Sequence, residues 1–250
     1  MSSSVVSDSL LEVEELRVSY GDAQALFGID LGVARGEVVA VLGANGAGKS
    51  TLAGAISGLV RPVGGNVCFK GNEISTLPSH RVAARGLAHI PEGRGIFPSL
   101  PVIDNLRMRL RRVGGRSERE AAIAVAFELF PILGQRRRQR AGTLSGGEQQ
   151  MLALAPVLAA PPSLLVADEL SLGLAPMLVD AIFQTLEQAR ARGVAILLIE
   201  QFVHRALAFA DRVVILQRGR IGWEGPSSEA GAEVLARYLS ETAAAEAEAS

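Results

Sequence analysis

A glycine-rich run that ends in a lysine and two hydroxyl residues carries the clearest chemical signal in the sequence. The run comprises Gly43, Ala44, Asn45, Gly46, Ala47, Gly48, Lys49, Ser50 and Thr51. An apolar stretch at 38–42 precedes it and a helix-like stretch at 50–59 follows, which is the strand–loop–helix setting of a phosphate-binding loop. Glycines let successive backbone N–H groups surround an anion, and the helix adds the positive end of its dipole. We therefore predict that Lys49 contacts the terminal phosphates of a nucleotide and that Ser50 binds Mg²⁺.

Two adjacent carboxylates, Asp168 and Glu169, end the apolar stretch 164–167. In a protein with a phosphate-binding loop, an aspartate at a strand end holds Mg²⁺, and we assign this role to Asp168. Glu169 is then the group that orients or deprotonates the attacking water, a task that contributes ~10²–10⁴-fold to a rate. The alternative is that the acid pair only caps the following helix.

A third motif, L-S-G-G-E-Q-Q, occupies positions 144–150. Its central residues are Ser145, Gly146, Gly147 and Glu148. Taken alone, the motif predicts a turn and a helix start, because serine is a favoured N-cap and the glycines expose backbone N–H groups.

These three motifs, in this order, resemble those of the ATP-binding-cassette (ABC) ATPases, and the resemblance covers about 11–239. It implies a RecA-like α/β P-loop core with an N-terminal antiparallel β-region and an inserted helical lobe. It also implies binding of ATP and Mg²⁺ and a head-to-tail pair of cassettes, in which the 145–148 signature of one closes on the γ-phosphate held by the other.

Three further residues take their roles from this resemblance. Tyr20 is expected to stack on adenine, and the less favoured alternative is a core residue at a strand end. Glu92 occupies the position of a glutamine that touches Mg²⁺ and the membrane partner. Gln201 stands where a histidine usually contacts the γ-phosphate.

Several short segments narrow the resemblance to one subfamily. They lie at 90–94, 97–98, 129–131, 139–143, 171–176 and 199–201. They are similar to segments of the ATP-binding subunits of importers for branched-chain amino acids and related amides or urea. This similarity implies two membrane subunits, a second ATP-binding subunit and an external solute-binding protein. It places the chain at the cytoplasmic face of the cell membrane, with the apolar segment 97–100 against a membrane subunit.

The sequence also departs from the family pattern. Leu170 replaces the usual proline after the acid pair, and Ala175 replaces an aspartate of many cassettes. Pro156 lies inside the signature helix, where it removes a backbone donor and crowds the carbonyl of Leu152, at a cost of ~3 kcal/mol if the helix stays regular. Gln201, Pro156 and Leu170 favour a second hypothesis, a low-turnover, nucleotide-gated dimerisation module of a heteromeric transporter. A soluble cassette protein of repair or translation is disfavoured, because such proteins usually carry paired cassettes or long insertions, which this sequence lacks. The signature motif disfavours a P-loop kinase.

Composition limits the remaining classes. The 250 residues carry a net charge of −1, which gives no indication of a nucleic-acid partner, and the single Cys68 excludes an internal disulfide. The sequence contains no uninterrupted run of about 18 apolar residues, so no transmembrane helix is predicted. The first residues lack the pattern of a signal peptide. We expect a flexible arm at 1–9, one ABC ATPase domain at 10–240 with its helical lobe at about 91–160, and a disordered tail at 241–250.

Hydrophobic periodicity and turn residues predict the secondary structure. Strands are expected at 11–19, 25–33, 38–42, 64–69, 86–90, 164–167, 194–199, 212–216 and 221–223. Helices are expected at 50–59, 81–85, 104–112, 117–133, 176–192, 202–209 and 232–239, with another inside 144–160. Ser117 and Glu120 are expected to form a capping box at the start of the 117–133 helix.

Overall fold

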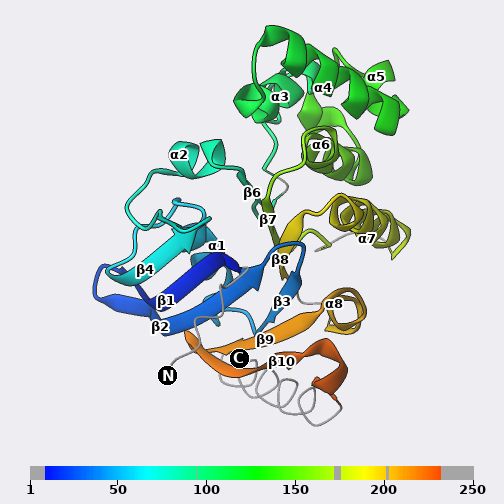
Figure 1. Cartoon of the computed structure of the whole chain (residues 1–250). Coiled ribbons are helices and arrows are strands. Elements are labelled where there is room, and N and C mark those ends of the chain that lie inside the picture. The colour runs from blue at the N-terminus through cyan, green and yellow to red at the C-terminus, as the bar shows by residue number, and fades with distance from the viewer. Residues whose placement is uncertain (1–8, 94, 172–175, 201–202, 232–250) are drawn as a thin grey trace.

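A six-stranded sheet forms the centre of the computed structural model, which describes residues 9–93, 95–171, 176–200 and 203–231 (Figure 1). The strand order is β10-β9-β3-β8-β7-β6. The strands are β3 Val38–Leu42, β6 Leu87–Ile90, β7 Leu164–Asp168, β8 Ala195–Ile199, β9 Arg212–Gln217 and β10 Arg220–Pro226. All are parallel except β10, which pairs antiparallel with β9. Every residue of β3, β7 and β8 is buried, as expected for a parallel sheet covered on both faces.

A four-stranded antiparallel sheet, in the order β2-β1-β4-β5, lies beside the central sheet (Figure 1). Its strands are β1 Ser9–Tyr20, β2 Ala23–Ala34, β4 Gly64–Phe69 and β5 Asn72–Glu73. Helix α1 (Lys49–Ile56) contacts strands of both sheets, and its buried Leu52 and Ile56 belong to the hydrophobic core between them. This core fixes the glycine-rich loop, which precedes α1, over the end of the central sheet.

Helices cover the other face of the central sheet. Helices α7 (Pro176–Ala191) and α8 (Val203–Phe209) share a second core with α6 (Gly146–Ala159). Within it, the rings of Phe183 and Phe209 meet edge to face, with their centroids 5.6 Å apart.

A group of helices stands away from both sheets, at the top of Figure 1. It consists of α3 (Val102–Arg109), α4 (Arg116–Leu129), α5 (Pro131–Gln135) and one end of α6. These helices have a core of their own, which includes Leu106, Ile123, Leu133 and Leu152. The shorter elements are α2 (Ser79–Ala84) and the 3-10 turns η1 (Leu110–Arg112), η2 (Ala141–Thr143) and η3 (Ser227–Glu229).

The prediction of one helix at 117–133 is wrong, because the chain breaks at Pro131. Pro131 cannot donate a backbone hydrogen bond and disfavours the helical conformation of the residue before it. Phe130 accordingly has φ −129 and ψ 78, between α4 and α5. The predicted capping box is also misplaced. The N–H of Gly115 donates to Glu118 Oε2 at 2.8 Å, two residues before the predicted pair of Ser117 and Glu120.

The other expected elements within the described residues are present, with ends that differ by no more than three residues. The two-residue strand β5 was not predicted, and the 104–112 helix ends at Arg109 and continues as η1. Helix α6 runs through Pro156 to Ala159, so the proline does not end it. The expected arm, the 232–239 helix and the tail lie outside the described residues, except for Ser9, which opens β1.

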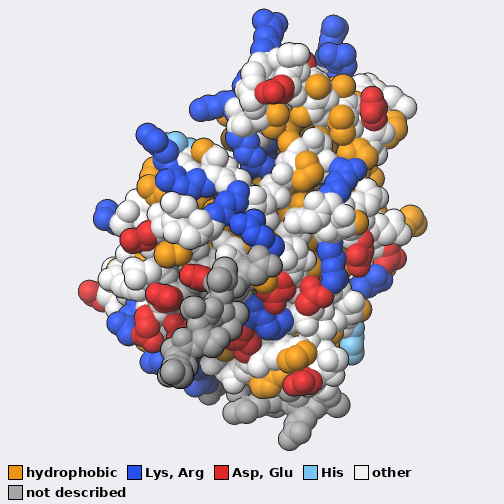
Figure 2. All heavy atoms as spheres, in the orientation of Figure 1, with side chains coloured by type: hydrophobic (Ala, Val, Ile, Leu, Met, Phe, Trp, Pro, Cys, Tyr) orange, Lys and Arg blue, Asp and Glu red, His pale blue; other side chains and the backbone are white. Residues whose placement is uncertain are grey.

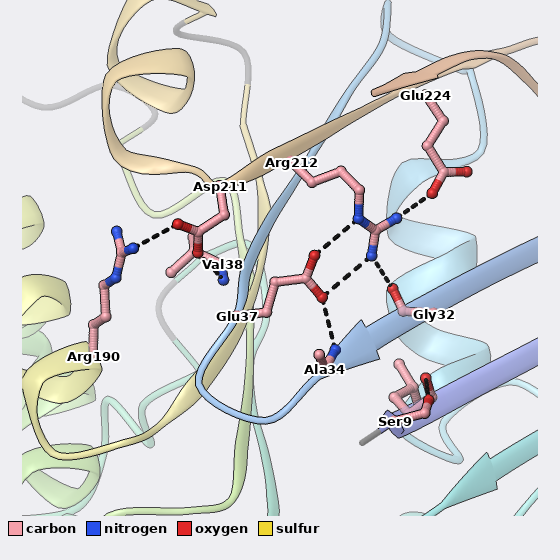
Figure 3. A network of polar contacts seen from close by, with 10 residues as sticks. Ser9, Gly32, Ala34, Glu37, Val38, Arg190, Asp211, Arg212 and Glu224 are labelled. Atoms are coloured by element: carbon pink, nitrogen blue, oxygen red, sulfur yellow. Dashed lines mark hydrogen bonds and ion pairs between the residues drawn. The ribbon is translucent and has the colours of Figure 1, made fainter. Parts of the chain in front are cut away.

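A polar network built on Arg212 joins the two sheets (Figure 3). Arg212, at the start of β9, donates to Glu37 Oε1 at 2.8 Å and to the carbonyl of Gly32 in β2 at 2.5 Å, and it also pairs with Glu224. Glu37 in turn accepts the N–H of Ala34 at 2.7 Å. The side chains of Arg212 and Glu37 are 23% and 19% exposed, so their bonds are largely protected from water.

Replacement of Arg212 by leucine should therefore lower the free energy of unfolding by about 2–3 kcal/mol, because it leaves Glu37 half-buried without its cation. For a chain of this size we expect the midpoint of thermal unfolding to fall by ~5–10 °C. Arg205→Leu is the matched control, since it breaks the exposed pair with Asp180 and should cost under ~1 kcal/mol. Equal losses in the two variants would contradict a structural role for the Arg212 network.

Candidate nucleotide site

The glycine-rich loop leaves β3 and enters α1 in a conformation that requires glycine. Gly48, immediately before α1, has φ +103, a left-handed value that residues with a Cβ rarely adopt. A Cβ on Gly43 would lie 2.5 Å from the carbonyl oxygen of Leu216 in β9, so no side chain fits there. The tip of the loop, Asn45 and Gly46, stays exposed.

Lys49 lies under this loop and is only 5% exposed. Its ammonium donates to the carbonyls of Gly43 at 2.8 Å and Ala44 at 3.1 Å, and it lies 3.3 Å from Glu169 Oε1. A lysine ammonium has three donors, and here each has a partner. A phosphate that approaches Lys49 must therefore displace at least one of these partners.

Asp168 ends β7, two strands away from β3 in the sheet, and is 3% exposed. Its side chain is hydrogen-bonded to Ser50, but Oδ1 has no hydrogen-bond partner among the described residues. Burial raises the pKa of Asp168 to about 6. The charges of Glu169 and Glu92 act in the same direction, whereas the Ser50 bond and Lys49 oppose the shift. The site thus holds a buried carboxylate whose charge Lys49 and Ser50 compensate only in part.

Glu169 follows with φ 49, a left-handed conformation that costs a residue with a side chain about 1–2 kcal/mol. Its N–H donates to the carbonyl of Ile199 at 2.9 Å, which ties the end of β7 to the end of β8. Leu170 is 4% exposed and packs in the second core. The family pattern has a rigid proline at this position after the acid pair. Here the packing of Leu170 in the core holds the turn instead.

The loop, Lys49 and Glu169 line one cavity of about 430 Å³. Its lining consists of Ala25, Asn45, Gly46, Gly48, Lys49, Ser50, Thr51, Glu92 and Glu169. Tyr20 is 55% exposed at the edge of this region, and its hydroxyl lies 3.5 Å from the hydroxyl oxygen of Thr51. The structure thus brings the predicted residues of three distant segments together, and Tyr20 is not a buried core residue.

Sequence reasoning missed a buried pair next to the site. Ser171 and Glu200 are 0% and 1% exposed, and the Ser171 hydroxyl donates to Glu200 Oε2 at 2.5 Å. This bond joins the segments that follow β7 and β8. A glutamate at the end of the apolar run 195–199 is the signal that could have revealed it. Ala25 was also missed, and nothing in its sequence context distinguishes it.

The signature residues form the N-terminus of α6 rather than part of this cavity. Ser145 accepts the N–H of Glu148 at 3.3 Å, and Glu148 Oε2 accepts the N–H of Ser145 at 2.9 Å. Glu148 also pairs with Arg136 at 3.1 Å. A Cβ on Gly147 would lie 2.5 Å from Leu178 Cδ2, so glycine permits the close contact with α7. Gln201, Ala175 and Arg94 lie outside the described residues.

A family model described as ABC transporter matches residues 26–171. The chain is an ATP-binding cassette of the ABC transporter family. The cassette is 42% identical over 216 residues to the high-affinity branched-chain amino acid transport ATP-binding protein BraG of Pseudomonas aeruginosa. The aligned region covers 85% of this chain and 91% of BraG. It is 36% identical to the probable branched-chain amino acid transport ATP-binding protein LivF of Archaeoglobus fulgidus, over 88% of this chain and 93% of LivF.

Solved structures agree with this assignment. The structure of an ATP-binding subunit of an ABC transporter matches the cassette with a TM-score of 0.77 at 31% identity, covering 87% of this chain and 90% of that one. A nucleotide-free cassette of an ABC transporter gives a TM-score of 0.76 at 26% identity, covering 93% and 95%. The predicted family, fold class and ATPase activity are thereby confirmed.

The raised pKa of Asp168 predicts a stability effect in the absence of nucleotide and Mg²⁺. Because the folded state binds this proton more tightly than the unfolded chain, the cassette loses stability as the pH rises through about 4 to 6. Asp168→Asn removes the buried charge and should stabilise the fold by up to ~3 kcal/mol near neutral pH, with little effect near pH ~4. Thermal unfolding in a chelator across this range is the measurement, with the exposed Asp22→Asn as control. A variant that is no more stable at neutral pH would contradict a buried carboxylate whose charge is compensated only in part.

Proposed function

We propose that the cavity binds the phosphates of ATP and that the residues around it hydrolyse the terminal one. The observation that carries this proposal is the convergence of Lys49, Ser50, Asp168 and Glu169, from segments more than a hundred residues apart, at one end of the central sheet. The backbone N–H groups of the loop and Lys49 hold the phosphates, and Tyr20 stacks on adenine. Glu169 orients and deprotonates the attacking water, and Gln201 donates to the γ-phosphate.

The same residues fit a magnesium ion. The unpartnered Oδ1 of Asp168 and the hydroxyl of Ser50 are oxygen donors of the kind that Mg²⁺ prefers, and Glu92 adds negative charge nearby. No group of three or more potential metal-binding side chains is present in the described part of the chain, so phosphates and water would complete the coordination. When bound, Mg²⁺ neutralises charge that develops on the phosphates.

Phosphate binding also draws Lys49 away from the catalytic carboxylate. Lys49 reaches a phosphate only by giving up one of its three present partners, and Glu169 is the one that a phosphate repels. As Lys49 turns to the phosphates, its ion pair with Glu169 is lost, and Glu169 acts as the base toward the attacking water. The signature of a second cassette then supplies the α6 N-terminus to the same phosphates.

The names of two relatives suggest the transported solute. Both BraG and LivF are branched-chain amino acid transport proteins by name. We propose that this cassette powers the import of branched-chain amino acids or related polar solutes, together with a second ATP-binding subunit, two membrane subunits and an external solute-binding protein. Among the described residues, no helix combines the length and the hydropathy of a membrane crossing. The cassette would act at the cytoplasmic face of the cell membrane.

A second candidate function is a low-turnover module in which ATP mainly holds two cassettes together. Gln201 favours it, because an amide cannot carry the charge that a histidine can. Pro156 and Leu170 support this function less than the sequence suggested, because α6 continues through Pro156 and Leu170 is buried in the core. Hydrolysis measured with and without the partner cassette separates the two functions.

A groove of about 470 Å³ is the proposed docking site for a membrane subunit. It lies between α2, β6 and α3, and Leu59, Phe97 and Met108 in its lining are 59%, 42% and 45% exposed. Asn105, which is 1% exposed, fixes the position of Phe97. Its Oδ1 accepts the Phe97 N–H at 2.7 Å, and its Nδ2 donates to the Phe97 carbonyl at 3.0 Å. Exposed apolar side chains held in place are typical of an interface.

Lys49→Ala should reduce ATP affinity about a hundredfold or more, because two charge-assisted bonds to phosphate are lost. Calorimetric titration with ATP measures this, and Lys70→Ala is the control, since Lys70 is the only other lysine and is exposed. Glu169→Gln should retain ATP binding but lower turnover by ~10²–10⁴-fold. Unchanged affinity in Lys49→Ala would refute the phosphate site, and normal turnover in Glu169→Gln would refute the assigned base.

Phe97→Ser should weaken assembly with the membrane subunits and leave ATP binding intact, because Phe97 is exposed in the groove and supports no core. Co-purification of the membrane subunits with the tagged cassette provides the readout. Met177→Ser serves as control, since Met177 is 81% exposed and does not line the groove. If Phe97→Ser co-purifies as well as the control, docking must use another surface.

A further inference from the structure

The charges of the cassette are unevenly distributed along the chain. Residues 81–140 contain 13 of the 25 basic residues but only 5 of the 26 acidic ones. This segment therefore has a formal charge of +8, and the remainder of the chain has −9. The near-zero net charge conceals this strong polarity.

The polarity is visible on the surface. In Figure 2, blue side chains gather over α2 and over the helices at the top of the view, whereas most red side chains lie in the lower half. The segment 81–140 includes α3, α4 and α5, together with most of α2 and β6. The part of the cassette formed by this segment is thus basic.

Five arginines of α2, η1 and the start of α4, here called the basic rim, have no acidic partner among the described residues. Arg81 lies in α2 and Arg85 directly follows it. Arg111 and Arg112 lie in η1, and Arg116 begins α4. All are exposed except Arg112, which is half-buried and lines the groove. Within the described residues, no carboxylate forms an ion pair with any of the five. In the same segment, by contrast, Arg107 pairs with Asp104 and Glu120.

The rim borders the groove through α2 and η1. Helix α2 gives Ser79, His80 and Ala83 to the groove lining, and η1 gives Arg112. The titratable residues of the lining are His80, His89, Arg109 and Arg112, and none of the described lining residues is acidic. Arg81 and Arg85 lie four positions apart on one side of α2, where Arg85 Nη1 donates to the Arg81 carbonyl at 3.3 Å.

We propose that the basic rim binds the headgroups of anionic phospholipids next to the membrane subunits. This rests on the proposed function, which turns the groove toward the membrane. Exposed cations spread over several elements fit a diffuse layer of negative charge better than the one or two carboxylates of a protein segment. Each arginine within about a Debye length of an anionic bilayer raises the partition coefficient roughly fivefold.

The test uses the purified full-length chain and vesicles. We expect it to sediment with vesicles of equal parts phosphatidylcholine and phosphatidylglycerol, and not with phosphatidylcholine alone. Binding should weaken as salt is added, because the surface charges become screened. Arg111→Glu with Arg116→Glu should reduce binding by at least ~tenfold. Arg205→Glu with Arg220→Glu makes the same change of charge on α8 and β10, outside the basic segment, and should have a much smaller effect.

Three outcomes would overturn the proposal: no binding to the anionic vesicles, equal binding to neutral ones, or equal losses in the two double variants. If the rim variant keeps its vesicle affinity but fails to co-purify with the membrane subunits, the partner of the rim is protein and the lipid proposal is wrong. ATP titration of every variant checks the fold. Failure of vesicle binding with intact ATP binding and assembly removes this proposal alone, whereas loss of ATP binding by the unmodified chain would remove the proposed function.

Discussion

The burial of one ammonium and two carboxylates at the same end of the central sheet is the constraint that the rest of this structure serves. Charges out of water must be compensated by hydrogen bonds or by each other. Lys49 meets this requirement with three partners, whereas Asp168 meets it only in part, and its pKa is raised to about 6. The site is therefore electrostatically incomplete in a way that phosphate and a divalent cation together can satisfy.

Such an arrangement needs a rigid support. The parallel strands β3, β8 and β7 are buried throughout. Asp168 ends β7, and the loop that follows β3 leads to Lys49 at the start of α1. The bond from Glu169 N–H to Ile199 and the buried pair of Ser171 and Glu200 tie the ends of β7 and β8 to each other. The Arg212 network fixes the antiparallel sheet, which carries Tyr20, against the central one. Short hydrogen bonds thus join the neighbouring strand ends that border the site.

The helices at the other end of the molecule have a different physical character. They have their own core and border an apolar groove, and several of their described arginines have no acidic partner in the described part of the chain. The signature residues cap α6 and do not line the cavity. They therefore lie outside the cavity formed by the loop of the same cassette. This separation agrees with a site that a second cassette completes, and it leaves the basic part free to face other partners.

The sequence by itself determined the phosphate loop, the acid pair at a strand end, the signature and nearly all strands, because each depends on local spacing and on the alternation of buried residues. It also contained the break at Pro131, which the long helical period at 117–133 obscured. Only the tertiary structure decided that Glu169 forms an ion pair with Lys49 and that Oδ1 of Asp168 has no hydrogen-bond partner among the described residues. It also decided that Leu170 is buried, so that packing holds the turn in which the family has a proline. These properties depend on burial and on contacts between residues far apart in the chain, and no local pattern encodes the distance between two side chains that meet only when the sheet forms.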